Sequence, residues 1–261
     1  MTDVSLVLPP QLFEEGPPGP TEAPVYMVEA GRYFQDFEFH QKKLLFHRAS
    51  MRRYADKLRE DRREVKYLAQ EDGEPLETLF EKNLTKGKSV LFYYDPVDHK
   101  LREKLRKLSS RFEVSLEEED NPGFITSEER FNDLFEGEDY RMSKFYRDQR
   151  RRLDVLMDDD GPEGGKWSFD TENRKSLPES VEVPDLPEFQ QEQDLKDQAQ
   201  YVKENFPDNP GSLDHFIYPV TRDAALKWFE GFLENRLRFF GDYQDAISSE
   251  KSFLFHSLIS L

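Results

Sequence analysis

The chain contains no cysteine among its 261 residues. A disulfide, a zinc site with thiolate ligands and an iron–sulfur cluster held by cysteines are therefore excluded within these residues. The chain also lacks any apolar run near the roughly 20 residues that a membrane-spanning helix needs. Its N-terminus has no basic segment followed by an apolar stretch, so a secretory signal is not expected. We expect a cytoplasmic monomer without a membrane partner.

Positive charge is in short supply. The chain has 37 Lys and Arg against 54 Asp and Glu, which gives a formal net charge of -17. Because phosphate contacts need clustered Lys and Arg, this balance argues against nucleic-acid binding by the chain as a whole. One local cluster of cations has nucleic-acid character: Arg147, Arg150, Arg151 and Arg152. A solvated helix whose cations pair with the acidic segment that follows is an equally good interpretation of this run.

Common nucleotide-binding and metal-binding motifs are also missing. No Gly-x-Gly-x-x-Gly occurs, so the usual dinucleotide fingerprint is absent. The Gly-Lys-Ser at 87–89 is similar to the end of a phosphate-binding loop, but Lys82 stands where that loop needs glycine, and a predicted strand follows instead of a helix. His40 and His47 could share a helix face. No carboxylate stands at ligand spacing, so we predict neutral core or surface histidines rather than metal ligands.

The first 118 residues alternate short apolar runs with amphipathic stretches. Hydrophobic residues make up 36% of the chain and aromatic residues 13%, enough to build a core. Strands that alternate with helices predict an α/β fold whose parallel sheet is covered on both faces. The predicted strands are Val4–Leu8, Pro24–Glu29, Glu64–Ala69, Ser89–Tyr94 and Phe112–Leu116, and the predicted helices are Phe39–Leu58, Pro75–Asn83 and His99–Leu108.

The pattern changes after residue 118, where an acidic run and an Asn-Pro-Gly turn follow. We therefore divide the chain into an α/β domain at 1–118, a linker at 119–189 and a helical segment at 190–261. The predicted helices beyond residue 118 are a basic one at Arg141–Met157, two at Asp194–Asn205 and Arg222–Phe240, with Thr221 as N-cap of the latter, and a last one from about Asp242.

The loop after the basic helix carries the most specific pattern in the chain. Within residues 159–175, the stretch Gly-Gly-Lys-Trp-Ser-Phe-Asp-Thr-Glu-Asn-Arg resembles the signature of the photolyase-related protein family, the bacterial six-four photolyase and cryptochrome group. Residues 6–12 and 27–29 resemble the first two strands of that family. The resemblance extends over the N-terminal half of a family member, through the further segments 40–52, 145–151, 206–208, 219–224 and 240–246.

This resemblance implies a Rossmann-like antenna domain with a parallel sheet at the N-terminus. A linker follows, and then the truncated start of an all-helical FAD-binding domain. The antenna chromophore of the family is usually a ribityl-lumazine. Ligands of open α/β sheets sit beyond the carboxyl ends of the strands. The α/β-then-helical pattern of the sequence agrees with this organisation.

The resemblance also assigns antenna contacts to residues near two strand ends. An amide and a carboxylate suit the polar edge of a flat heterocycle, because they offer both donors and acceptors. A Glu29 side chain that pairs with Arg32 is the alternative. Pro10 departs from the aspartate that the family usually has, which leaves the identity of the antenna open. The assigned residues are Gln11 and Glu29, with Lys43 and Phe46 as secondary choices.

The last residues resemble the start of the flavin pocket of the family, where a helix N-terminus rich in Ser and Thr binds the flavin diphosphate. Such termini are good anion sites. The resemblance therefore assigns FAD contacts to Ser257, Leu258 and Ser260. An ordinary amphipathic helix with a core face is the alternative. The rest of the pocket and the cysteines of an iron–sulfur cluster would lie in the missing C-terminal half.

The activity that the resemblance implies is light-dependent DNA repair. An excited antenna passes energy to FAD, and the flavin donates an electron to a pyrimidine lesion in damaged DNA. A complete protein would be a DNA photolyase, which is a carbon–carbon lyase, whereas these residues alone are expected to be inactive. Two alternatives stay open: a blue-light cryptochrome photoreceptor, and a non-catalytic fragment that only binds a chromophore.

Overall fold

The computed structural model describes residues 2–70, 73–137, 139–159, 161–169, 175–185, 193–250 and 254–255. The chain divides into two compact units. Unit 1 consists of Met1–Ile125 and Phe189–Ala224, and unit 2 of Thr126–Glu188 and Ala225–Leu261. No helix in the described ranges is long and apolar enough to cross a membrane.

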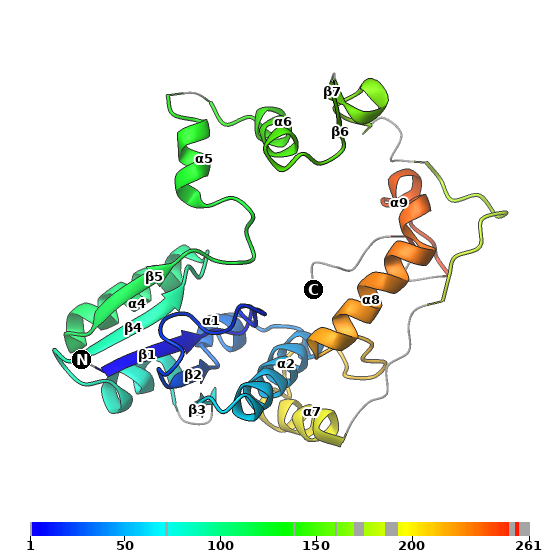
Figure 1. Ribbon diagram of the computed structural model, residues 1–261. Helices are drawn as coiled ribbons and strands as arrows, with labels where there is room; N and C mark the ends of the chain where they lie inside the picture. Colours follow the sequence, from blue (N-terminus) through cyan, green and yellow to red (C-terminus); the bar gives the residue numbers. More distant parts are fainter. Residues whose placement is uncertain are drawn as a thin grey trace. The chain divides into compact units, whose positions relative to one another are not determined.

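A five-stranded parallel sheet forms the centre of unit 1. Its strands are β1 (Thr2–Val7), β2 (Val25–Val28), β3 (Val65–Leu68), β4 (Ser89–Tyr94) and β5 (Ser115–Glu119). The strand order is β3-β2-β1-β4-β5 (Figure 1). The chain therefore builds outward from β1 to β3 and then returns to the other side of β1. The connections of β1 and β4 diverge at their carboxyl ends, and this is the switch point where open α/β sheets bind ligands.

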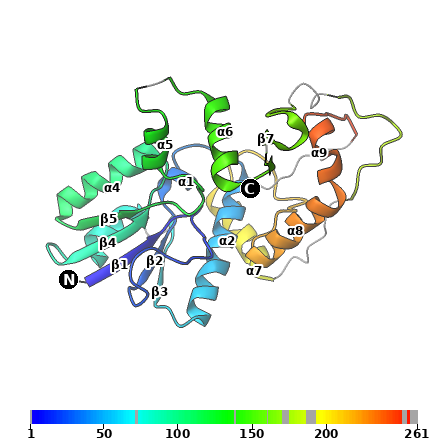
Figure 2. The same ribbon diagram turned by 45° about the horizontal axis from the view of Figure 1, so that its top comes forward.

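Helices cover both faces of the sheet, as the sequence predicts. The side chains of β1 alternate, so that Leu6 enters one hydrophobic cluster and Val7 the other. On the Leu6 face lie α3 (Pro75–Thr78), the π-helical turn η2 (Leu79–Asn83) and α4 (His99–Phe112). On the Val7 face, α2 (Gln41–Glu60) and α7 (Gln193–Asn205) lie side by side (Figure 2).

Most predicted elements of unit 1 are present with shifted ends. Strand β4 begins and ends where the sequence predicts. Helix α4 continues to Phe112 instead of stopping at Leu108, and it ends where Glu113 adopts a left-handed conformation with φ 52°. The predicted start of the fifth strand at Phe112 is therefore wrong, because β5 begins at Ser115.

The first helix of the segment predicted as helical, residues 190–261, packs on the sheet domain within unit 1. Helix α7 buries Leu195 and Val202 in the same cluster as the apolar face of α2. Residues 189–224 thus share a unit with the sheet. The predicted division of the chain at 118 and 189 into antenna domain, linker and FAD-binding domain stays a prediction.

Unit 2 holds short helices and one small hairpin. The segment predicted as a linker contains a short acidic helix, α5, in addition to the predicted basic one. Ser127 caps α5 by accepting a hydrogen bond from the Arg130 amide at 3.2 Å. The elements are α5 (Glu128–Leu134), α6 (Met142–Leu153), β6 (Met157–Asp158), β7 (Gly161–Pro162), the 3-10 turn η3 (Glu163–Gly165) and α9 (Leu237–Tyr243), with most of α8 (Arg222–Asn235).

The single helix predicted at 222–240 is wrong, because the chain breaks into α8 and α9 at Arg236. The side chain of Arg236 is buried and donates to the carbonyls of Leu254 at 3.2 Å and Asp185 at 3.1 Å. Turning a cation inward to these carbonyls interrupts the helix. The predicted N-cap is confirmed, since the Thr221 hydroxyl accepts from the Ala224 amide at 3.3 Å.

Two glycines in one loop of unit 1 give a matched test of the packing under β4. Gly16 and Gly19 both have positive φ, at 94° and 81°, so alanine at either position costs about 1–2 kcal/mol of backbone strain. A Cβ at Gly19 would lie 2.5 Å from Cγ of Phe92, whereas a Cβ at Gly16 would meet nothing within 4 Å.

We expect Gly19→Ala to lower the free energy of unfolding by about 1–3 kcal/mol more than Gly16→Ala, because only the former overpacks against Phe92. Urea denaturation of both variants measures the difference. Equal losses would contradict the close packing of this loop on the sheet.

Candidate functional site

The carboxyl ends of β1 and β4 meet at Gln11. A tight turn follows β1, in which the Gln11 amide donates to the Leu8 carbonyl at 2.9 Å, and Pro10 is exposed in this turn. The Gln11 side chain is 2% exposed, and its Nε2 donates to the carbonyls of Tyr94 at 3.1 Å and Asp95 at 3.0 Å. Gln11 therefore connects the turn after β1 to the backbone at the end of β4, at the switch point of the sheet.

The other end of the Gln11 amide has no protein partner among the described residues. Its Oε1 is buried, and no described group donates a hydrogen bond to it. Leaving a buried acceptor unsatisfied costs about 1–3 kcal/mol, so native structures rarely do so without a reason. Both donors of the same amide are used, and Oε1 is suited to an N–H or O–H group of a ligand.

Glu29, which follows β2, is fully buried and engaged within the protein. Its Oε1 accepts from Arg48 Nη1 at 2.6 Å and from the Tyr67 hydroxyl at 2.7 Å, and its Oε2 accepts from the Gln70 amide at 3.0 Å. Burial raises the pKa of Glu29, and the Arg48 charge opposes this shift. The alternative pairing with Arg32 is wrong, because Arg32 binds Asp98 at 2.7 Å instead.

Arg48 extends this network from the strand to both helices of the face. It lies on α2 and its side chain is 5% exposed. Its Nε donates to Gln198 Oε1 at 2.8 Å, and its guanidinium lies 3.3 Å from the ring centroid of Tyr201. One cation thus joins the end of β2 to α2 and α7.

Lys43 and Phe46 lie on the first two turns of α2. The Phe46 ring packs edge-on to Tyr218 at 6.5 Å, and Lys43 Nζ lies 4.3 Å from the ring centroid of Phe39. The structure brings the ends of β1 and β2 together as sheet neighbours, with Val7 opposite Met27. Antenna contact by Gln11, Glu29, Lys43 and Phe46 stays a proposal.

His47, which the sequence predicts to be a neutral core or surface residue, is a further polar group on α2. Its ring lies 5.9 Å from the Tyr33 ring and 6.2 Å from the Phe34 ring, and neither ring nitrogen has a hydrogen-bond partner among the described residues. Burial first, and the charge of Lys43 second, lower the pKa of His47 to about 4. At neutral pH it is an uncharged imidazole with one donor and one acceptor. The clue in the sequence is a histidine on the apolar side of the helix, which itself follows the aromatic residues Tyr33 and Phe34.

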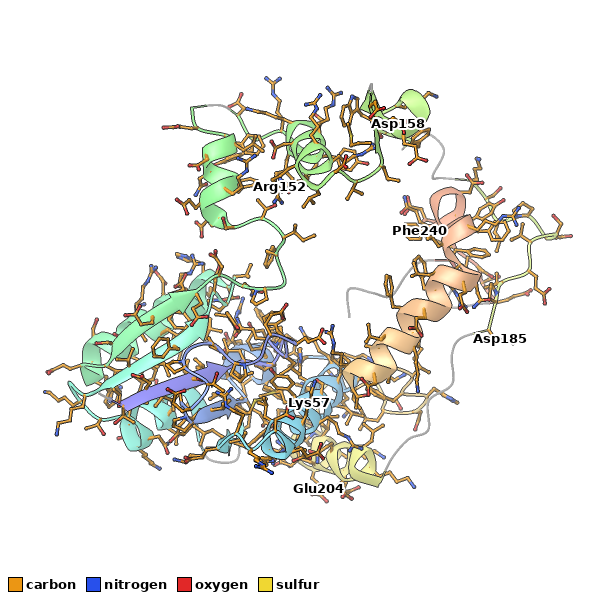
Figure 3. The ribbon with its side chains drawn as sticks, in the orientation of Figure 1. Lys57, Arg152, Asp158, Asp185, Glu204 and Phe240 are labelled. Atoms are coloured by element: carbon orange, nitrogen blue, oxygen red, sulfur yellow. The ribbon has the colours of Figure 1, made fainter. Side chains whose placement is uncertain are left out.

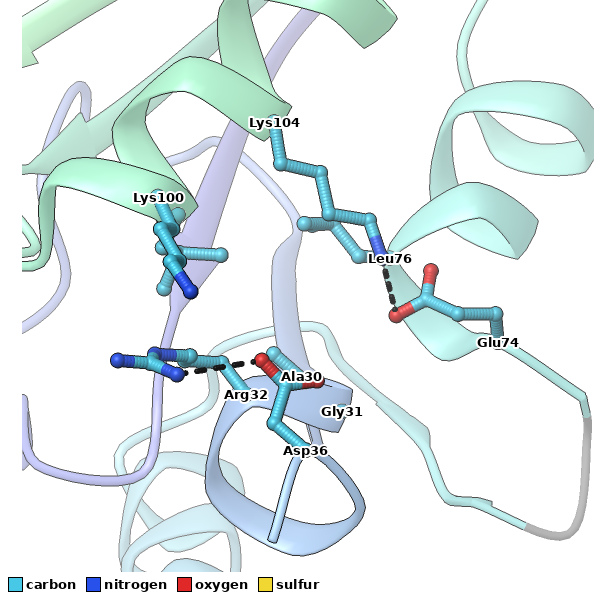
Figure 4. Close-up of a pocket in the computed structure, with 9 residues that line it drawn as sticks. Ala30, Gly31, Arg32, Asp36, Glu74, Leu76, Lys100 and Lys104 are labelled. Atoms are coloured by element: carbon cyan, nitrogen blue, oxygen red, sulfur yellow. Dashed lines mark hydrogen bonds and ion pairs between the residues drawn. The ribbon is translucent and has the colours of Figure 1, made fainter.

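A small pocket lies on the other face of the sheet, between α1 (Gly31–Phe34), α3 and α4 (Figure 4). Its volume is about 100 Å³, whereas sites for drug-sized ligands measure about 300–1,000 Å³. Arg32 pairs with Asp36 at 3.3 Å across it, and Lys104 with Glu74 at 3.0 Å. This pocket is too small for a flat heterocycle, and its charges are largely neutralised.

The FAD contacts predicted at Ser257, Leu258 and Ser260 lie outside the described residues. The structure therefore has no bearing on them. Among the described residues, no three His, Asp or Glu side chains are grouped so as to hold a metal ion.

Comparison with known proteins finds a matching family model and similar curated proteins. A family model described as deoxyribodipyrimidine photo-lyase-related protein matches residues 5–218. The chain is 29% identical over 228 residues to a (6-4) photolyase of Agrobacterium fabrum, with 85% of this chain and 45% of that protein covered. It is 32% identical over 193 residues to an uncharacterized protein of Acanthamoeba polyphaga mimivirus, with 69% of this chain and 98% of that protein covered. The chain thus spans about half the length of the photolyase.

Removing Arg48 tests the network that holds the site. We expect Arg48→Ala to lower the free energy of unfolding by about 3–5 kcal/mol, because it leaves the Glu29 carboxylate buried without its cation. Chemical denaturation measures this loss. Arg59→Ala on the same helix is the control, since Arg59 forms an exposed pair with Asp56 at 2.8 Å and should contribute less than about 1 kcal/mol. A similar loss in both variants would refute the role given to Arg48.

The environment of His47 predicts a pH dependence of stability. Between the folded pKa of about 4 and the ordinary value of 6.5, the unfolded chain binds the proton and the folded chain does not. The neutral His47 side chain therefore contributes fully to the free energy of unfolding above pH 6.5. This contribution is lost as the pH falls toward 4, at up to about 1.4 kcal/mol per pH unit.

We expect the slope of unfolding free energy against pH between 4.5 and 6.5 to be smaller for His47→Gln than for the wild type. His99→Gln is the control, because the side chain of His99 is 80% exposed. Urea titrations at several pH values measure the slopes. An unchanged slope for His47→Gln would mean that His47 is protonated equally in both states.

Proposed function

Because this chain belongs to the deoxyribodipyrimidine photo-lyase-related protein family, we propose that it carries the antenna-binding part of a light-dependent DNA photolyase. The α/β unit is the part that binds a ribityl-lumazine in this proposal. Damaged DNA is the substrate of the whole activity, and FAD is its redox cofactor. The (6-4) photolyase relative supports a photolyase-like function.

The observation that carries the antenna proposal is the free acceptor of Gln11. It lies at the switch point of a parallel sheet, which is where such sheets bind ligands. The pteridine edge and the ribityl chain of a lumazine carry groups that can donate or accept hydrogen bonds. A ligand hydroxyl or N–H at Gln11 Oε1 would satisfy the one open position of this amide.

The surroundings of α2 suit a flat aromatic molecule. Neutral His47 adds a second donor and acceptor without a charge that would have to be desolvated. Phe46 and Tyr33 add aromatic rings, and such rings prefer edge-on or offset contacts with one another. In this proposal Gln11, Glu29, Lys43 and Phe46 contact the antenna, and His47 adds a further donor and acceptor. Glu29 also orients α2 through Arg48.

When bound, the antenna supplies light absorption and passes the excitation on. The residues of this chain bind and orient it, and they exclude water from its polar edge. Contact with FAD by Ser257, Leu258 and Ser260 and a cytoplasmic location belong to the same proposal.

Ligand binding tests the role of Gln11 directly. We expect the purified chain to bind 6,7-dimethyl-8-ribityllumazine, with a shift in its fluorescence anisotropy. Gln11→Met keeps the approximate side-chain length and removes the acceptor together with the Nε2 bonds to the carbonyls of Tyr94 and Asp95, so the affinity should fall at least about tenfold.

Gln41→Met is the matched control, because it removes an amide that donates to the Phe206 carbonyl at 3.1 Å in the same unit. Its affinity should match the wild type. Absence of lumazine binding by the wild-type chain would refute the antenna proposal. Equal affinity of Gln11→Met and wild type would refute only the contact at Gln11.

A further inference from the structure

The conspicuous Gly-Gly-Lys-Trp segment lies in unit 2 and takes no part in the site at the sheet. Its backbone folds back toward α6. Strand β6 pairs with β7, and the Glu163 amide donates to the Leu156 carbonyl at 2.9 Å. Gly164 and Gly165 both have left-handed φ, at 72° and 70°, which side chains with a Cβ rarely adopt. This turn brings Trp167 against the basic helix.

Three guanidinium groups of α6 surround the Trp167 ring. Those of Arg147, Arg150 and Arg151 lie 5.6, 5.3 and 4.8 Å from its centroid. Arg150 is buried and donates to the carbonyls of Val155, at 3.2 Å, and of Leu156, so it holds the turn that follows the helix. The basic run is therefore divided into one structural arginine and others that face solvent.

Arg147 and Arg151 are exposed cations. Within the described ranges neither forms a hydrogen bond or an ion pair, and their one partner is the indole ring. Helix α6 carries five Lys and Arg against a single acidic residue, Asp148, which pairs with Arg130 at 3.1 Å. A local excess of positive charge thus stands out in a chain of net charge -17.

Exposed aromatic rings accompany these cations. Tyr146 is 43% exposed and Phe169 is 53% exposed, and Lys166 lies 5.8 Å from the Phe169 ring. Figure 3 shows the side chains of α6 and the hairpin, with Arg152 and Asp158 labelled. We call Tyr146, Arg147, Arg151, Lys166 and Phe169 the Trp167 surface.

Unpaired guanidinium groups next to exposed rings are the combination that recognises single-stranded nucleic acid. Phosphates bind the cations, and unstacked bases stack on aromatic and guanidinium planes. We propose that the Trp167 surface binds an unpaired stretch of DNA, with Arg147 and Arg151 on phosphates and with Tyr146 and Phe169 against bases. This rests on the DNA-repair function proposed above.

Binding of a fluorescein-labelled, single-stranded 12-mer of DNA to the whole chain tests the surface. We expect Arg147→Ala/Arg151→Ala to lower the affinity about tenfold at low salt and to reduce the slope of log K against log salt by about 1.4, as for two lost phosphate contacts on a single strand. Tyr146→Ser/Phe169→Ser should weaken binding with an unchanged slope.

Lys86→Ala/Lys107→Ala is the matched control, because it removes two exposed cations of unit 1 and changes the net charge equally. It should alter the affinity less than twofold. The proposal is overturned if the wild type binds no DNA, or if the arginine and the lysine double variants lose affinity equally. It is also overturned if polyglutamate of equal charge displaces the labelled DNA as well as unlabelled DNA does. Lumazine binding by the same protein reports on the antenna proposal independently.

Discussion

The buried ion pair between Arg48 and Glu29 is the constraint on which the arrangement of the α/β unit depends. The two side chains are 5% and 0% exposed, and 2.6 Å separates their charged atoms. Such a pair is costly to desolvate and costlier still to break on one side. Arg48 also contacts Gln198 and Tyr201 of α7. The end of β2, α2 and α7 must therefore adopt one geometry together, and His47, one residue before Arg48, is positioned by it.

Two polar side chains of the α/β unit, Gln11 and His47, carry buried atoms without a described hydrogen-bond partner, and Gln11 lies at the switch point of the sheet. Gln11 is locked by two carbonyls beyond β4, which leaves its own oxygen free of described donors. His47 is neutral and surrounded by rings. Both groups offer directional hydrogen bonds without a net charge. In the antenna role proposed for this member of the photolyase-related family, these groups bind a neutral, planar ligand with a polar edge.

The sheet could be predicted from the sequence because buried parallel strands are short apolar runs, and β4 matches at both ends. The switch point follows from the same topology, and Gln11 lies there. The partner of Glu29 could not be predicted, since Arg48 is 19 residues away and meets it only through packing of α2 on the sheet. The helix at 128–134 was hidden by its acidic composition, and the break at Arg236 depends on carbonyls distant in the chain.

The most direct measurement is side-chain nitrogen NMR of the isotopically labelled chain during titration with 6,7-dimethyl-8-ribityllumazine. We expect the Gln11 amide and the His47 imidazole signals to shift together and to saturate at one ligand per chain, while the Gln41 amide signal stays in place. Saturable binding that leaves both the Gln11 and the His47 signals unmoved would contradict this expectation.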